Sequence, residues 1–359
     1  MKNHKRAERE FGADVVRCVA TAFIIGVHFF LHNGFYQQPQ QGIAMFGADF
    51  LRWLTYSCVP LFLILTGYLK SECRVSLKYY RGILPILLTF LLMSGICIGF
   101  KTGYRHIQKS VWEWIVDIFN YKAADYAWYI ELYIGLFLLC PFLNAGFHAR
   151  SEGWYHKVLA GTMICIAFIP SLFNGMVIRG VEFNPIPDYF VSLWPFAYYV
   201  LGCYIRSYQP KLPKSLCLLL ICSVCLLKTM LTFCMAEGQD FSHGIGGGYS
   251  DFWVGAITVL VFLFCYNLET KQPVLRRLVA HISKRSLHIY LISAVFDVLL
   301  KDMGIDFTLP QSYWWTFPLK CSLVFIGSLL VSEVTYPVTV WVTQVFGNFV
   351  FKMKNLSQN

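Results

Sequence analysis

Two ionisable side chains, those of Arg17 and His28, lie within one apolar stretch of the sequence, from Ala13 to His32. An ionisable group inside a membrane-spanning helix costs at least a few kcal/mol, so its presence suggests a function. Eleven residues at about 100° per residue leave the two side chains within about 20° of each other and roughly 16 Å apart along the helix axis. A guanidinium at one depth and an imidazole, which titrates near neutral pH, at another indicate chemistry inside the membrane.

Each of these two residues also has a simpler interpretation. Arg17 could extend its side chain to the phosphates of the membrane surface. His28 could be an interior histidine that hydrogen-bonds a neighbouring helix. Their position on one helix face favours a shared role over two unrelated structural roles.

The elements that must position these residues are membrane-spanning helices. Of the 359 residues, 57% are hydrophobic and only 14% are charged, which is too apolar for a soluble domain of this length. We predict an all-α polytopic membrane protein in which residues 1–359 form a single domain, with tails at 1–12 and 347–359. Ten stretches approach the ~20 residues that a spanning helix needs, namely 13–33, 48–69, 82–100, 127–146, 157–174, 189–206, 214–235, 252–268, 286–301 and 318–346. The last is expected to be tilted or broken near Pro337.

Positive charges between the predicted spans indicate the orientation in the membrane. With the N-terminus inside, the inner segments hold most of the 30 Lys and Arg residues. The outer segments hold few, apart from one set of four: Lys101, Arg105, Lys109 and Lys122. This alternation favours about ten spans with both termini cytoplasmic. The net charge of +10 therefore reflects orientation in the membrane and not affinity for nucleic acid.

The 13 cysteines lie mostly within apolar stretches and lack a metal-binding arrangement, so we expect free thiols and no metal site.

Further candidate residues lie near the ends of the predicted spans. Lys78 and Arg81, three apart at an inner helix start, could bind phosphates of a nucleotide-like cofactor or simply follow the positive-inside pattern. Trp128 and Tyr129 stand at the outer end of the fourth span, where aromatic residues often anchor a helix. Glu131, one turn further in, is expected to be a buried carboxylate. Three more charged residues within spans have no assigned partner: Lys228, Asp297 and Glu333.

Several sequence blocks, in this order, resemble the acyltransferase-3 family of integral membrane acyltransferases. The Arg17 and His28 pair resembles the first-helix signature of the family, an Arg and a His separated by ten residues. Further blocks over residues 10–300 resemble later parts of the family: VPLFLILTGYL, DYAWYIELYIGLFLLCPFL, WPFAYYVLGCYI and SKRSLHIYLIS.

The chain departs from the family pattern at three places. The family often has a paired arginine where this chain has Lys78 and Arg81, a glycine where it has His288, and a histidine where it has Ser293. These differences concern the subfamily and the substrate more than the class of reaction.

The resemblance implies an O-acyltransferase of the cytoplasmic membrane. Such an enzyme moves an acyl group, usually acetyl, from cytoplasmic acyl-CoA to a hydroxyl of a surface polysaccharide or lipid-linked glycan at the outer face. His28 is then expected to be the general base, or a carrier of the acyl group, with Glu131 orienting its imidazole. Arg17 would orient the donor or polarise its thioester carbonyl. The residues implied for substrate binding are Arg17, Lys78 and Arg81 for acyl-CoA, and Trp128 and Tyr129 for the sugar.

A straight helix holds Arg17 and His28 too far apart to contact the same atom. Either the pantetheine arm of CoA extends between them, or a kink brings donor and acceptor together. A second class of function is a transporter or flippase for a polar solute or glycan, because ten spans and intramembrane charges also permit it. The absence of a visible internal repeat weakens that class, and release of CoA on turnover would distinguish the two.

Overall fold

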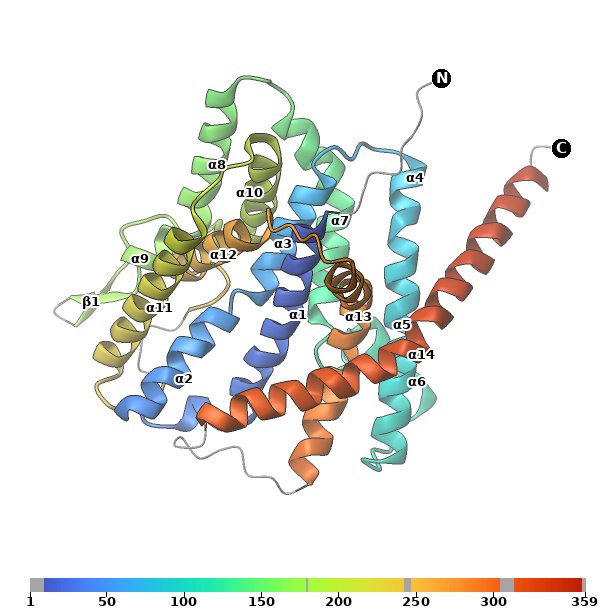
Figure 1. Cartoon of the computed structure of the whole chain (residues 1–359), viewed down its shortest axis with the longest axis horizontal. Coiled ribbons are helices and arrows are strands. Elements are labelled where there is room, and N and C mark those ends of the chain that lie inside the picture. Colours follow the sequence, from blue (N-terminus) through green and yellow to red (C-terminus); the bar gives the residue numbers. More distant parts are fainter. Residues whose placement is uncertain (1–9, 179, 242–246, 304–312, 357–359) are drawn as a thin grey trace. The chain divides into compact units, whose positions relative to one another are not determined.

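The computed structural model of the protein describes residues 10–178, 180–241, 247–303 and 313–356, with the side chains of all of these except 176–178 and 346–356. Most of the predicted N-terminal tail and the last residues of the C-terminal tail therefore lie outside the described residues. The described chain is almost entirely α-helical (Figure 1). It forms two compact units, the first comprising residues 1–72, 143–284 and 307–317, and the second residues 73–142, 285–306 and 318–359.

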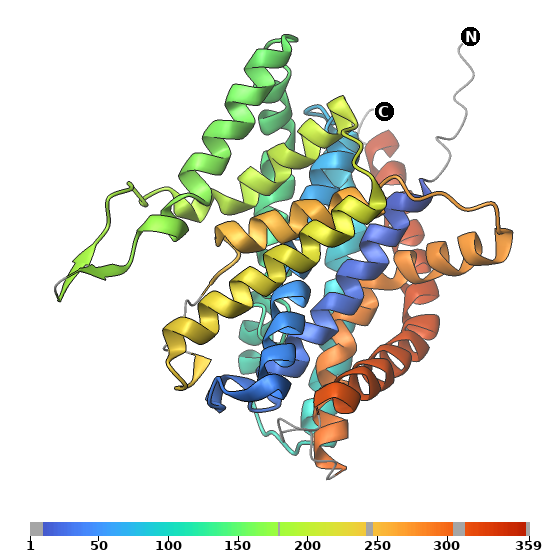
Figure 2. The same ribbon diagram turned by 60° about the vertical axis from the view of Figure 1, so that its left-hand side comes forward.

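The first unit contains helices that pack mainly through apolar faces. Its helices are α1 (Phe11–His32), α2 (Gly42–Thr55), α3 (Cys58–Lys70), α8 (Gly153–Ala167), α9 (Pro170–Phe173), α10 (Trp194–Tyr208), α11 (Lys214–Ala236) and α12 (Phe252–Cys265), with 3₁₀ turns η1 (Phe35–Gln37) and η3 (Val191–Leu193). Helix α3 packs against α10 and α1, and α11 packs against α12. An antiparallel hairpin of β1 (Met176–Ile178) and β2 (Val181–Phe183), with residue 177 opposite residue 182, extends from α9 away from these helices (Figure 2).

Helices α3 and α10 approach each other closely because a glycine from each lies at their crossing. A Cβ atom at Gly67 would lie 2.0 Å from the carbonyl oxygen of Tyr199, and one at Gly202 would lie 2.1 Å from that of Ile64. Only glycine fits at such distances. Since α3 is apolar on nearly every side, this contact lets it lie in the core of the unit.

The second unit begins with a continuous helical run of α4 (Leu77–Tyr80), η2 (Arg81–Ile83) and α5 (Leu84–Gly103), followed by α6 (Val111–Phe119). Three long helices contribute residues to both units: α7 (Trp128–Phe147), α13 (Pro273–Asp302) and α14 (Tyr313–Leu356). Tyr79 attaches α4 to α7, because its ring stacks on Phe137 at 4.4 Å and its hydroxyl donates to the Phe137 carbonyl oxygen.

Six segments in the described residues are long and apolar enough to cross a membrane: Phe11–His32, Gly42–Lys70, Leu77–Gly103, Trp128–Phe147, Lys214–Ala236 and Tyr313–Val345. Each overlaps a predicted span, and together they make this a multi-pass membrane protein. The four other predicted spans correspond to α8, α10 and α12, of 14 or 15 residues, and to the charged helix α13. Fifteen residues of helix reach only about 22 Å. The count of ten spans and the location of the termini therefore stay predictions.

Helix α14 continues through Pro337 as one helix, so the predicted alternative of a break at this proline is wrong.

Candidate active site

Helix α1 carries both residues at the centre of the predicted site. It is one continuous helix from Phe11 to His32 and contains no proline. Without a proline or an interruption there is no cause for a sharp kink. Arg17 and His28 therefore lie on one face, about 16 Å apart along the axis.

The Arg17 guanidinium is held in place from two helices. Its Nη1 donates to the Ser283 hydroxyl of α13 at 2.8 Å and lies 3.5 Å from the Asp14 carboxylate of α1. The Ser283 hydroxyl in turn donates to Asp14 at 2.7 Å. The Arg17 side chain keeps 26% of its surface exposed, so this network fixes its direction while leaving it accessible to a ligand.

His28 lies near the other end of α1, where it is buried with 8% of its surface exposed. The ring of His32, one turn further along, lies 6.4 Å away and is exposed. The neighbouring Phe30 stacks on Phe317 at 5.3 Å and forms part of an aromatic cluster at this end of the helix. Because His28 is buried, hydrogen bonds and charge interactions of its imidazole are stronger than they would be in water.

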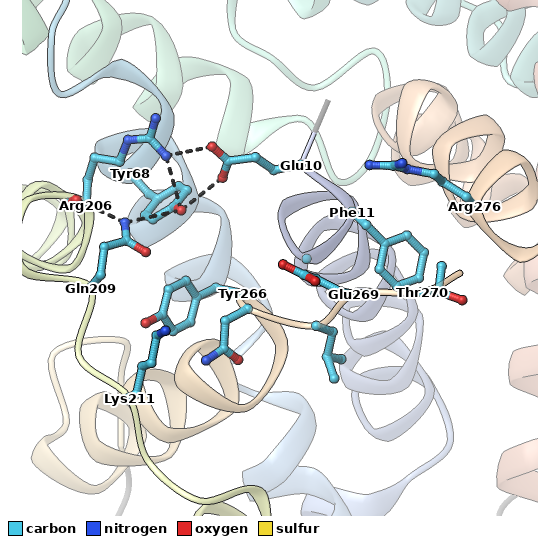
Figure 3. Close-up of a pocket in the computed structure, with 13 residues that line it drawn as sticks. Glu10, Phe11, Tyr68, Arg206, Gln209, Lys211, Tyr266, Glu269, Thr270 and Arg276 are labelled. Carbon is cyan, nitrogen blue, oxygen red and sulfur yellow. Dashed lines mark hydrogen bonds and ion pairs between the residues drawn. The ribbon is translucent and has the colours of Figure 1, made fainter. Parts of the chain in front are cut away.

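A cavity of about 550 Å³ opens at the start of α1 (Figure 3). The residues that line it come from five segments: Glu10, Phe11 and Gly12; Tyr68; Arg206, Gln209 and Lys211; Tyr266, Asn267, Leu268, Glu269 and Thr270; and Arg276. Gly12 allows α1 to touch the end of α12, since a Cβ there would lie 1.9 Å from the Tyr266 carbonyl oxygen.

One side of this cavity is ordered by a hydrogen-bond network around Glu10 (Figure 3). Arg206 donates to the Glu10 carboxylate at 2.7 Å and to the Tyr68 hydroxyl at 3.2 Å. Tyr68 donates to Glu10 at 2.9 Å, and Gln209 donates to the Tyr68 oxygen at 3.4 Å. The network leaves the cavity with three cations and two carboxylates, a net charge of +1.

The cavity and the two α1 residues follow one line along the helix. Glu10 is the N-cap of α1, and Arg17 and His28 follow it by seven and eighteen residues. At about 100° per residue all three positions fall within about 20° of one helix face. Arg206, Lys211 and Arg276 are among the inner-segment cations that indicated the orientation, and the sequence alone did not show that they line one cavity beside α1.

Lys78 and Arg81, predicted to bind the donor, lie in the second unit at the start of its helical run. Both are exposed. The Ser76 side chain caps α4 by accepting a hydrogen bond from the Tyr79 amide at 3.1 Å. The segment is thus ordered, and its two cations are open to solvent.

The expectation that Glu131 is a buried carboxylate is wrong, because its side chain is exposed. It follows Tyr129 and Ile130, which are 8% and 1% exposed and turn towards the core of the second unit. Each further residue rotates by about 100°, so the next side chain points outward. Trp128 is 40% exposed at the first turn of α7, whereas Tyr129 lies among the rings of Trp128, Tyr133 and Tyr290.

Each charged residue that the sequence left without a partner has one in the structure. The pairs, each within one unit, are Lys228 with Asp251 at 2.9 Å, Asp297 with Lys320 at 3.6 Å, and Glu333 with Arg285 at 2.8 Å. Ion pairing accounts structurally for the buried charges of Lys228 and Asp297 and for the partly exposed carboxylate of Glu333.

Arg52 is a buried cation that the sequence interpretation missed. It is 3% exposed, and its guanidinium carbon lies 4.0 Å from the Trp53 ring and 4.1 Å from the Tyr56 ring. Its Nε donates to the Tyr36 hydroxyl at 3.3 Å. The available signal was Asp49 and Arg52, three residues apart within an otherwise apolar stretch.

Comparison with known proteins identifies the family of this chain. The model of the acyltransferase-3 family, described as an acyltransferase domain, matches residues 11–333 and so covers α1 with both Arg17 and His28. No curated protein and no solved structure gives a significant match. A match over nearly the whole chain, on a multi-pass helical structure, shows that the protein belongs to the acyltransferase-3 family and is a membrane O-acyltransferase.

Proposed function

We propose that the protein transfers an acetyl group from cytoplasmic acetyl-CoA to a hydroxyl of a surface polysaccharide or lipid-linked glycan at the outer face of the cytoplasmic membrane. The observation that carries this proposal is the placement of a cation-lined cavity, Arg17 and His28 in succession along one face of α1. The whole chain acts as a single domain with ten spans and both termini inside.

The donor enters at the cavity. Its phosphates meet Arg206, Lys211 and Arg276, which the positive-inside pattern places on the cytoplasmic side. The pantetheine arm then extends along α1 past Arg17, whose guanidinium is directed by Ser283. Lys78 and Arg81, exposed at the inner end of their own helical run, are additional contacts for the donor.

The chemistry takes place at His28. The imidazole accepts the proton of the acceptor hydroxyl while its oxygen attacks the thioester carbonyl carbon. The carbon–sulfur bond then breaks, and the CoA thiolate takes up a proton. Arg17, about 16 Å away along the axis, is too distant to polarise that carbonyl, so its role is to orient the donor. Trp128 and Tyr129 are proposed to stack on the sugar, and Glu131 to tune the acceptor side.

The test is turnover by the purified full-length protein in liposomes. Acetyl-CoA is supplied on one side and glycan extract on the other, and free CoA thiol and acetylated glycan are both measured. Equal amounts of the two products support the proposal. Movement of glycan without release of CoA would instead show a transporter.

A paired variant sharpens this test. His28→Ala removes the proposed base, and His32→Ala removes an exposed histidine one turn away on the same helix. Activity lost only in the first variant ties the reaction to His28. Equal activity of both variants would refute its role.

A further inference from the structure

The four basic residues that interrupt the positive-inside pattern meet at one place in the second unit. Lys101, Arg105, Lys109 and Lys122 line a single cavity of about 300 Å³, formed by the end of α5, the connection to α6 and the segment before α7. Four cations on a side of the membrane that otherwise carries few are unusual. Their convergence on one cavity indicates that these cations bind an anion and do not serve to orient the chain in the membrane.

Two of these cations are neutralised within the cavity and two are not. Lys101 pairs with Asp125 at 2.5 Å, and Lys109 pairs with Asp117 at 2.6 Å. Among the described residues, Arg105 and Lys122 have no ion-pair partner, and both side chains are exposed. Four cations and two carboxylates leave the cavity a net charge of +2.

Helix α6, beside this cavity, carries an exposed apolar stripe. The stripe residues recur at helical spacing on one face: Val111 (78% exposed), Trp112 (70%), Ile115 (38%), Val116 (37%) and Phe119 (78%). Trp114 and Asp117 lie away from that face and line the cavity. A short helix with one apolar face and one polar face, joined at both ends to membrane-spanning helices, is typical of the membrane interface.

We propose that α6 lies in the outer interface of the bilayer and that the cavity behind it binds the phosphate of a lipid molecule there. The stripe enters the acyl-chain boundary, which places Arg105 and Lys122 at the depth of the headgroups. A guanidinium and an ammonium suit a phosphate that carries one or two negative charges. The phosphate belongs to an anionic phospholipid of the bilayer, whose chains lie beside the apolar stripe. The location on the outer side rests on the orientation in the proposed function.

Binding is measured with the full-length protein in detergent micelles by native mass spectrometry, so no turnover is needed. The probes are short-chain phosphatidylglycerol and glycerol 1-phosphate. The double variant Arg105→Gln with Lys122→Gln should bind phosphatidylglycerol about 30-fold more weakly, because each charge near a membrane surface contributes roughly fivefold. The matched control, Arg150→Gln with Lys157→Gln, removes two exposed cations elsewhere and should bind like wild type.

The two probes separate the headgroup from the chains. The double variant Trp112→Ser with Phe119→Ser should also bind phosphatidylglycerol more weakly, and glycerol 1-phosphate should bind weakly to every form of the protein. These two results together identify the ligand as an intact lipid. Equal binding of both probes, lost in the Arg105 and Lys122 variant, would show a site for a phosphate group alone and would overturn the assignment to a lipid. Binding unaffected by the Arg105 and Lys122 variant, or no binding by wild type, overturns the proposal. Because turnover is not measured, either failure leaves the acyltransferase assignment intact.

Discussion

His28 is buried near one end of α1, and this burial leads to the first prediction. A general base contributes about 10²- to 10⁴-fold to a rate. We therefore expect His28→Ala to lower kcat by at least about 100-fold with an unchanged amount of folded protein, measured as CoA release. His32→Ala should retain most of the activity, and a large loss in that control would contradict a specific role for His28.

The cavity at the start of α1 leads to a second prediction. Lys211→Gln combined with Arg276→Gln removes two cations that face the proposed path of the donor. Since a charge-assisted hydrogen bond contributes about 1.5–3 kcal/mol, KM for acetyl-CoA should rise at least tenfold while kcat changes little. Lys271→Gln, an exposed neighbour outside the cavity, is the control. A fall in kcat with an unchanged KM would place these cations away from donor binding.

At the residue scale, the sequence identified Arg17 and His28 because their spacing along one helix is a local property. It did not identify Ser283 as the partner of Arg17, since the two are 266 positions apart and only the packing of α1 and α13 brings them together. The partners of Lys228, Asp297 and Glu333 were missed for the same reason.

The crossing of α3 and α10 leads to a prediction about an element pair. Gly67→Ala places a methyl group 2.0 Å from a backbone carbonyl oxygen that has no rotamer to relieve the overlap. Overpacking of this kind costs about 1–3 kcal/mol, so the thermal unfolding midpoint should fall. Gly95→Ala in α5, where a Cβ would meet nothing within 4 Å, should be neutral or slightly stabilising. Equal effects of the two substitutions would refute a tight crossing.

The start of α6 should respond to pH. Hydrogen bonds from the Ser110 backbone and side chain hold the pKa of Glu113 below its ordinary value of 4.5. A pKa lowered by folding means that the stabilisation is complete above pH 4.5 and is lost as the pH falls through the folded-state value. Amide exchange of residues 111–119, corrected for its intrinsic rate, should therefore increase in that acid range. Glu113→Gln should abolish the pH dependence, and persistence of the dependence would assign it to another group.

The elements themselves were predicted with uneven success. Long apolar runs such as Phe11–His32 appear in sequence and structure alike, because length and hydropathy are enough to predict a spanning helix. Helix α6 was not predicted, because it has only nine residues and its apolar residues are interrupted by Glu113 and Asp117, so they do not form a run long enough to span a membrane. The prediction that Glu131 is buried was wrong for a related reason. Hydropathy indicates how deep a residue lies along a helix but not which face of the helix it occupies.

At the scale of the whole molecule, the orientation can be tested by labelling. In a chain with its cysteines replaced by serine, an impermeant maleimide should label Lys122→Cys in intact cells. Arg150→Cys and Lys271→Cys should react only after the membrane is opened, because the positive-inside pattern places them in the cytoplasm. Labelling of Arg150→Cys in intact cells would place this residue outside. The four spans predicted before it could then not all cross the membrane, which would contradict the count of ten.

The continuity of α1 has a consequence for the energetics of the cell membrane. In the proposed reaction, with Arg17 near one end of α1 and His28 near the other, the acetyl group formally leaves the cytoplasm as a cation, and the CoA thiolate left behind needs a proton. If the proton taken by His28 returns inward along α1, the exchange is electrically neutral. If it leaves outward, each turnover moves one positive charge against an inside-negative potential, which opposes it by about 2.3 kcal/mol per 100 mV. The voltage dependence of the rate therefore reports the direction in which the proton leaves His28.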